Sequence, residues 1–262
     1  MKRRLFALGA LACFAAGSII LGCTNDAPKM TVLRVGATPV PHAQILRVAA
    51  KLLANEGIDL QVIEFNDYVQ PNLALADKEL DANFFQHKTY LSHFTKAHKV
   101  KLEPLAAVHI EPMGVYSVKH ASARNMKKGA TVALPSDAVN LARALNLLAE
   151  AGLVGLKGGE GLADVNENPR ALRFVTMAPE KLPYALADVD FAVINANFAL
   201  QAGLHPGHAL YAEAIDSPYA NVLAIRAGDH REVLQKLSVA LNSAEVRAFI
   251  LEHFKGELVP AF

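Results

Sequence analysis

The sequence predicts an α/β fold made of two lobes that are joined by two crossings of the chain. Short β-rich runs alternate with segments whose apolar residues recur at helical spacing, and this alternation starts a second time in the middle of the chain. Two helical segments at the C-terminus then need a sheet to cover, which favours a return to the first lobe. Such alternation is typical of mainly parallel sheets with helices on both faces.

The first set of elements opens with a β-rich run at 32–37, followed by a helix that Gly57 ends. Two further strands and two further helices follow along the chain. The expected ranges are strands at 58–65 and 81–85, a loop entering a short helix at 66–80, and a helix at 87–98.

The second set follows a pair of extended stretches at 102–118. Its expected elements are strands at 130–135, 171–177 and 190–195, with helices at 136–153, 179–188 and 196–204; another extended stretch at 217–226 precedes helices between 229 and 254. We therefore expect one lobe from residues 31–113 and 220–262, and a second lobe from residues 114–219, with crossings near 111–117 and 216–222.

The N-terminus has the features of a secretory signal peptide, which we expect to span residues 1–22. Three basic residues precede an uncharged run at 5–21, and a small residue precedes Cys23. The letters "ILGC" resemble a bacterial lipobox, in which the cysteine becomes the lipid-modified N-terminus. Cys13 lies in the discarded segment, so acylation accounts for an otherwise lone exported thiol at Cys23. An uncleaved membrane anchor is the alternative.

The expected mature protein is a domain held by its lipid at a membrane, facing the periplasm or the cell exterior, on a polar tether at 23–30. Without residues 1–22 it has 23 basic and 25 acidic residues, a net charge of −2. That balance does not indicate a nucleic-acid surface. No later segment has the uninterrupted apolar length that crosses a bilayer.

Unusual side chains follow the carboxyl ends of four predicted strands, where ligands gather in open α/β sheets. In "DANFFQH", period-two alternation sends Phe84 into the core and Phe85 to the other side. We expect Tyr68, Phe85 and His87 to form an aromatic wall of a cleft between the lobes, which suits an apolar side chain or a thioether. His87 taken alone is more typical of a surface residue.

The second lobe supplies polar candidates for the opposite wall. Asn140 and Arg143 share a face near a helix N-terminus, where a guanidinium and free N–H groups suit a carboxylate. An exposed Arg143 on a solvated helix is the alternative. Asn195 and Asn221 offer side-chain oxygens to an ammonium, or serve as turn or capping amides.

Several separate motifs together resemble the NlpA/MetQ family of methionine-binding lipoproteins, the substrate-binding components of methionine ABC importers. They are "FNDYVQPNLAL", "DANFFQHKTYL", "PSDAVNLARALNLL", "AVINANFALQAGL" and "SPYANVLAIR", in the family's order. The resemblance implies a type II periplasmic-binding-protein fold that closes on methionine, with L-methionine expected, and a permease and an ATPase as partners.

Carried over residue by residue, the resemblance places Tyr68, Phe85 and His87 around the ligand's side chain. It places Arg143 with Asn140 on the carboxylate. The other candidates are Asn195 and Asn221 on the head group, with His109 and Glu111 at the first crossing.

Other readings of the sequence remain open. The ligand could be another apolar amino acid or a methionine derivative. An exported hydrolase is disfavoured because neither a Gly-x-Ser-x-Gly nor a His-Glu-x-x-His motif is present. A metal-capturing protein is suggested by "HPGH", but His205 and His208 have no third ligand nearby in sequence, and solvated loop histidines are the simpler interpretation. We expect no enzyme activity, no cofactor and no metal.

Overall fold

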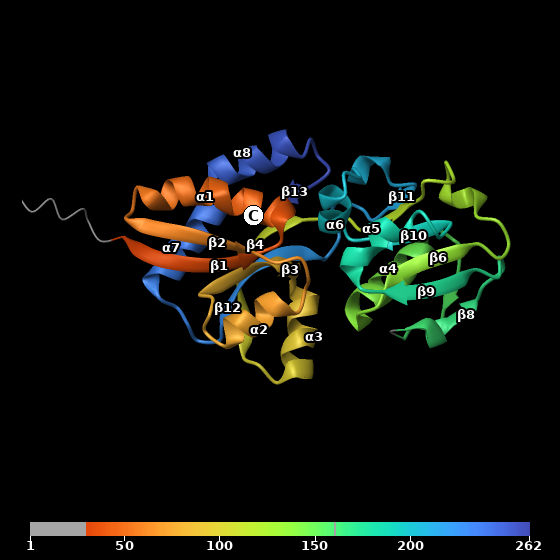
Figure 1. The fold of residues 1–262 in the computed structure, drawn as a ribbon, viewed down its shortest axis with the longest axis horizontal. Coiled ribbons are helices and arrows are strands. Elements are labelled where there is room, and N and C mark those ends of the chain that lie inside the picture. The colour runs from red at the N-terminus through yellow and green to blue at the C-terminus, as the bar shows by residue number, and fades with distance from the viewer. Residues whose placement is uncertain (1–29, 160) are drawn as a thin grey trace, which may run out of the picture.

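The computed structural model describes residues 30–159 and 161–262, and Figure 1 shows them arranged as two α/β lobes side by side. The predicted signal peptide, Cys23 and all but the last residue of the predicted tether lie outside the described residues. Within the described part of the chain, no helix combines the length and the apolar character needed to cross a bilayer.

The first lobe is built on a six-stranded sheet that combines the N-terminal third of the chain with its C-terminus. Strands β1, β2 and β3 are parallel, whereas β12 is antiparallel to both β3 and β4, and β13 is antiparallel to β4. In spatial order the strands are β13 (Val259–Pro260), β4 (Leu102–Ile110), β12 (Ala220–Arg226), β3 (Ala82–His87), β1 (Thr31–Ala37) and β2 (Ile58–Glu64).

The expectation of mainly parallel sheets is wrong for this lobe. The chain leaves the lobe through β4 and comes back through β12 from the same end, so the two strands must run in opposite directions. The carboxyl ends of β1, β3 and β4 consequently all point toward the second lobe (Figure 1).

Helices cover both faces of this sheet (Figure 1). The apolar spacing of α1 buries Ile45, Leu46, Ala49 and Leu53 against the sheet together with residues of the two C-terminal helices. Phe84 is fully buried in the same core, as its alternation with Phe85 predicts. The helices are α1 (Gln44–Ala54), α7 (Glu232–Leu241) and α8 (Ala244–His253) on one face, with α2 (Gln70–Ala76) and α3 (Lys88–His98) on the other.

The second lobe has a five-stranded mixed sheet in the order β11-β5-β10-β6-β9. Its strands are β11 (Tyr211–Ala212), β5 (Gly114–Tyr116), β10 (Phe191–Ile194), β6 (Thr131–Pro135) and β9 (Arg173–Met177). Helix α4 (Ala138–Glu150) packs Leu145 and Leu148 on one side of it. Helices α5 (Leu182–Ala185) and α6 (Ala196–Gln201) contribute to a separate apolar cluster.

Smaller elements complete the fold. A separate antiparallel pair is formed by β7 (Gly155–Leu156) and β8 (Val165–Glu167). Five short helical turns are η1 (Pro39–Ala43), η2 (Ala123–Asn125), η3 (Leu162–Asp164), η4 (Pro179–Lys181) and η5 (Pro206–His208). The chain passes between the lobes after β4 ends at Ile110 and again before β12 begins at Ala220.

Candidate functional site

A pocket lies between the two lobes, at the ends of the strands that point toward the second lobe. Both lobes contribute lining residues, which is typical of ligand sites at domain interfaces. Its lining residues are Tyr68, Phe85, Gln86, His87, Tyr90, Glu111, Asn140, Arg143, Asn195, Ala196, Asn197 and Asn221.

The structure brings together all but one of the side chains that the sequence singles out. The exception is His109, which does not line the pocket, because its ring points from β4 toward Glu111, which stands between it and the cavity. Asn221 is the second residue of β12 and pairs in register with His87 of β3, so it belongs to a strand of the first lobe.

One wall of the pocket is aromatic. The Tyr68 ring lies 5.8 Å from the Phe85 ring and 5.7 Å from the Tyr90 ring, measured between centroids. Phe198 of the second lobe lies 4.9 Å from Tyr68, so the two lobes contribute rings to one cluster. Such a cluster offers large apolar area and polarisable faces to a ligand side chain.

His87 presents a hydrogen-bond donor to the pocket. It caps the N-terminus of α3, where its Nδ1 accepts from the backbone N–H of Tyr90 at 3.2 Å. Nε2 therefore carries the ring proton, and this buried atom has no hydrogen-bond partner within the described residues. Burial, with the nearby Arg143 charge as the second cause, lowers the pKa of His87 to about 3, so the ring is neutral at physiological pH.

On the opposite wall, Asp137 and Asn140 orient the side-chain amide of Asn195, which offers an acceptor to the pocket. Asp137 caps α4 by accepting from the backbone N–H of Asn140 at 2.9 Å, and its two oxygens also accept from Asn140 Nδ2, each at 3.1 Å. Asn140 Oδ1 is thereby turned to accept from Asn195 Nδ2 at 2.9 Å. Asn195 Oδ1 is left buried without a partner within the described residues, in a position to accept from a ligand.

Arg143 is buried, with 4% of its surface exposed, which excludes the alternative of a solvated arginine. Its Nε donates to Glu213 Oε1 at 2.7 Å, and its Nη2 donates to Glu213 Oε2 at 2.5 Å and to the carbonyl of Glu111 at 2.8 Å. The guanidinium also lies over the Tyr219 ring, 4.2 Å from its centroid. Among the described hydrogen bonds none uses Nη1, which remains available for a ligand.

Asn197 links the lobes and was not singled out from the sequence. Its Oδ1 accepts from the Tyr68 hydroxyl at 2.6 Å, and its Nδ2 is buried without a partner within the described residues. It stands two residues after Asn195 in the quoted motif "VINANF", which was its one signal in the sequence. Burial is the main cause that raises the pKa of Tyr68, so the hydroxyl keeps its proton and acts as the donor.

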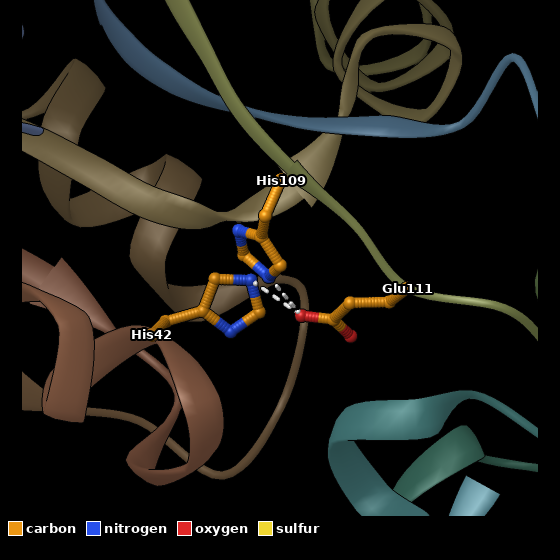
Figure 2. Close-up of side chains that lie close together, drawn as sticks. All are labelled: His42, His109 and Glu111. Atoms are coloured by element: carbon orange, nitrogen blue, oxygen red, sulfur yellow. Dashed lines mark hydrogen bonds and ion pairs between the residues drawn. The ribbon is translucent and has the colours of Figure 1, made fainter. Parts of the chain in front are cut away.

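Glu111 is the acidic residue of the pocket. Its Oε1 lies 2.6 Å from His109 Nε2 and 3.2 Å from His42 Nε2, and Figure 2 shows both rings converging on this one oxygen. Burial raises its pKa, while His42, Arg143 and the backbone N–H of Asn197 oppose that rise. The "HPGH" histidines are elsewhere: His205 precedes η5, His208 ends it, and both are exposed. His205 lies 3.4 Å from Glu257.

Comparisons with known proteins identify the family of the chain. The family model described as NlpA lipoprotein matches residues 33–262. The D-methionine-binding lipoprotein MetQ of Salmonella typhimurium is 37% identical over 263 residues, which cover 97% of this chain and 96% of the relative. The methionine-binding lipoprotein MetQ of Bacillus subtilis is 36% identical over 270 residues and 98% of each chain.

A solved structure gives the same result for the fold. A nutrient-binding protein from Burkholderia cenocepacia, bound to methionine, superposes with a TM-score of 0.85 at 41% identity, over 88% of this chain and 100% of that one. The predicted two-lobed periplasmic-binding-protein fold is thus confirmed. Because the family model and the relatives cover nearly the whole chain, the protein belongs to the NlpA lipoprotein family.

Proposed function

We propose that the protein is the methionine-binding component of an ABC importer. The observation that carries this proposal is one pocket in which an aromatic wall meets three buried polar atoms that lack partners within the described residues: His87 Nε2, Asn195 Oδ1 and Asn197 Nδ2. Buried polar atoms are ordinarily hydrogen-bonded, so their convergence indicates a polar ligand. An amino acid with an apolar side chain matches both walls.

The aromatic wall takes the ligand's side chain in this proposal. Burial of a methionine side chain contributes about 1.5–3 kcal/mol, and a thioether beside aromatic rings adds roughly 0.3–1.5 kcal/mol. Tyr68, Phe85 and Tyr90 are the rings that surround this end of the pocket. The names of the MetQ relatives and the methionine in the Burkholderia structure support methionine over other apolar amino acids.

The polar wall takes the zwitterion. The free Nη1 of Arg143 and the Nε2–H of His87 are donors suited to the ligand's carboxylate. Asn195 Oδ1 is an acceptor suited to the ammonium, with Glu111 supplying negative charge to the same pocket. Asn140 differs from its expected role: both ends of its amide are occupied by Asp137 and Asn195, so it acts on the ligand by orienting Asn195.

Closure of the lobes completes the site. Tyr68 and Asn197 come from different lobes and meet over the pocket, and Gln201 of the second lobe donates to Asn66 of the first at 3.1 Å. A ligand that contacts both walls favours the closed form through contacts that only this form provides. The closed form is then the one delivered to the permease and ATPase of the importer.

The lipid anchor is part of the proposal. The relatives carry the name lipoprotein, and the expected acylation site is Cys23, which lies outside the described residues. Mass spectrometry of the mature N-terminal peptide tests it, with a diacylglyceryl-modified cysteine expected. In cells, Cys23→Ala should move the protein from the membrane fraction to the soluble fraction, and retention in the membrane fraction would contradict the assignment.

The ligand is tested by denaturing the purified protein and identifying the released small molecule by mass spectrometry, followed by calorimetry on the ligand-stripped protein. We expect methionine, with L-methionine bound more tightly than D-methionine or leucine. Arg143→Ala and Asn221→Ala should each abolish measurable methionine binding while circular dichroism stays native. Release of a different molecule, together with no heat from methionine, would overturn the proposed ligand.

A further inference from the structure

A chain of buried polar contacts runs behind the pocket and includes a histidine that does not line it. The Thr38 hydroxyl lies 2.7 Å from His42 Nδ1, and His42 Nε2 lies 3.2 Å from Asn221 Oδ1 and 3.2 Å from Glu111 Oε1. Thr38 and His42 are fully buried, and Asn221 is 5% exposed. His42 therefore contacts two pocket-lining residues without lining the pocket itself.

The direction of these hydrogen bonds follows from the Glu111 carboxylate that lies beside both rings. His109 Nε2 hydrogen-bonds Glu111 Oε1 at 2.6 Å, and His42 Nε2 lies 3.2 Å from the same oxygen, as Figure 2 shows. An unprotonated His42 Nε2 would turn its lone pair toward that carboxylate oxygen, so Nε2 is the nitrogen that carries the proton. His42 Nδ1 then has a lone pair and accepts from the Thr38 hydroxyl. Burial, the largest cause, lowers the pKa of His42 to about 4, which keeps the ring neutral in this tautomer.

The same proton fixes the Asn221 amide. His42 Nε2–H also faces Asn221 Oδ1, so the oxygen of the amide points to the histidine and its N–H₂ group is the end left for the pocket. Asn221 Nδ2 makes no hydrogen bond among the described residues. This orientation makes Asn221 a donor toward the ligand, whereas the sequence suggested an acceptor for an ammonium.

The two histidines and Glu111 also have the residue types of a metal site, and their donor atoms lie within 4.8 Å of one another. Bonds of about 2.0–2.2 Å to one tetrahedral ion would hold two donor atoms roughly 3.3 Å apart. The 2.6 Å between His109 Nε2 and Glu111 Oε1 is a hydrogen-bond distance instead. The Phe84 ring packs edge-on against both imidazoles, with centroids 4.7 Å and 5.3 Å away, and so fixes their positions.

We propose that His42 is a positioning residue that holds the Asn221 amide with its N–H₂ toward the pocket, so that Asn221 donates to the ligand's carboxylate. The inference rests on the proposed function in one respect, namely that the ligand is an amino acid. It adds His42 as a residue that acts on the ligand through Asn221, and it assigns Asn221 the role of hydrogen-bond donor. Without His42, the Asn221 amide is free to turn its oxygen toward the carboxylate and repel it.

A double-mutant cycle measured by calorimetry with L-methionine tests this role. His42→Leu should weaken binding at least about tenfold, as expected when a buried polar group loses its partner. His42→Gln can place a donor where Nε2 lies and should stay within about threefold of wild type by the same reasoning. Where Asn221→Ala leaves binding too weak to measure, Asn221→Ser replaces it in the cycle. Adding His42→Leu to the Asn221 variant should cause little further loss of methionine affinity.

His109 supplies the control, because its ring hydrogen-bonds the same oxygen of Glu111. It is the cross-strand neighbour of Asn221 in β4, but among the described hydrogen bonds none joins the two side chains. The fold-losses in methionine affinity caused by His109→Leu and by the Asn221 variant should multiply when the two changes are combined. The proposal is overturned if the affinity losses of the His42→Leu and Asn221 variants also multiply, or if His42→Gln binds methionine as weakly as His42→Leu. A role of His42 in folding alone predicts both results. Circular dichroism and thermal unfolding identify variants that fail to fold.

A measurement on the wild-type protein keeps the inference falsifiable without any variant or ligand. Long-range ¹H–¹⁵N NMR distinguishes histidine tautomers, and we expect the His42 ring to be protonated at Nε2. Protonation at Nδ1 would make Nε2 an acceptor, reverse the Asn221 amide and overturn the proposal. If methionine does not bind the wild-type protein, the proposed ligand fails, while the tautomer still decides the orientation of Asn221.

Discussion

Tyr68 of the first lobe donates a hydrogen bond of 2.6 Å to the side-chain oxygen of Asn197 of the second lobe. The two residues are 129 positions apart in sequence and both line the pocket. The bond can form only when the lobes are together. It therefore joins closure of the protein to the orientation of the Asn197 amide, whose nitrogen is left for the ligand.

Tyr68→Phe should weaken methionine binding about three- to tenfold, since it removes one hydrogen bond worth roughly 0.5–1.5 kcal/mol and keeps the ring. Calorimetry measures the affinity, and small-angle scattering should show a larger radius of gyration for the ligand-free variant. Tyr184→Phe is the matched control, because Tyr184 is 73% exposed. Identical affinity in wild type and Tyr68→Phe would show that the bond does not stabilise the closed, liganded form.

The ion pair between Arg143 and Glu213 should be important for stability as well as for the site. Only 4% of the Arg143 side chain and 9% of the Glu213 side chain are exposed, so removing one partner leaves a buried charge uncompensated. We expect Glu213→Ala to lower the free energy of unfolding by about 3–5 kcal/mol. Urea denaturation measures this loss.

A surface pair on the same chain provides the comparison. Glu232 pairs with Lys236 at 3.3 Å, but its side chain is 84% exposed. Glu232→Ala should cost no more than about 0.5 kcal/mol. Similar losses for Glu213→Ala and Glu232→Ala would contradict the importance assigned to burial of the Arg143 pair.

The adjacent phenylalanines of β3 should have separable roles. Phe84 is fully buried in the core of the first lobe, and Phe84→Ala should cost about 3–5 kcal/mol of unfolding free energy. Phe85 lines the pocket, so Phe85→Leu should weaken methionine binding about tenfold by lost aromatic contact with a thioether. Chemical denaturation and calorimetry measure the two effects. A Phe84→Leu variant that loses affinity more than Phe85→Leu would contradict the assignment.

Stability should fall as the pH drops below about 6.5. Burial lowers the pKa of His42 to about 4 and the pKa values of His87 and His109 to about 3, whereas the unfolded chain takes up these protons near pH 6.5. Each histidine then removes about 1.4 kcal/mol per pH unit from the free energy of unfolding as the pH falls toward its folded-state pKa. The raised pKa values of Glu111 and Asp137 act in the opposite sense at acidic pH.

His87→Asn isolates one of these contributions, because asparagine also caps a helix N-terminus. Urea denaturation between pH 7.5 and 4.5 should give a shallower decline for His87→Asn, by about 1.4 kcal/mol per pH unit below pH 6. Parallel profiles for the two proteins would mean that His87 takes up its proton in the folded state near the usual pH.

The local parts of this molecule could be predicted from its sequence. Period-two alternation separates Phe84 from Phe85, and apolar spacing places α1 and α4 against their sheets. The ends of predicted strands located most of the pocket, because ligands gather at the carboxyl ends of strands in open α/β sheets. The restart of the strand–helix alternation and the two C-terminal helices predicted the two lobes, and resemblance to the family added His109 and Glu111.

The features that could not be predicted from the sequence depend on contacts between segments that are far apart along the chain. Glu213 pairs with Arg143 across 70 residues, and His42 meets Asn221 across 179 residues. No spacing rule connects such partners before the fold is known. The mixed sheets were missed for a related reason, since the direction of β12 is set by the chain's return from the second lobe rather than by its own residues.

The crystal structure of the protein with L-methionine tests the central claim most directly. It should show the sulfur among the rings of Tyr68, Phe85 and Tyr90, the carboxylate on Arg143 Nη1 and Asn221 Nδ2, and the ammonium on Asn195 Oδ1. A ligand bound outside the cavity between the lobes, or lying with its carboxylate on Asn195 and its ammonium beside Arg143, would contradict the account.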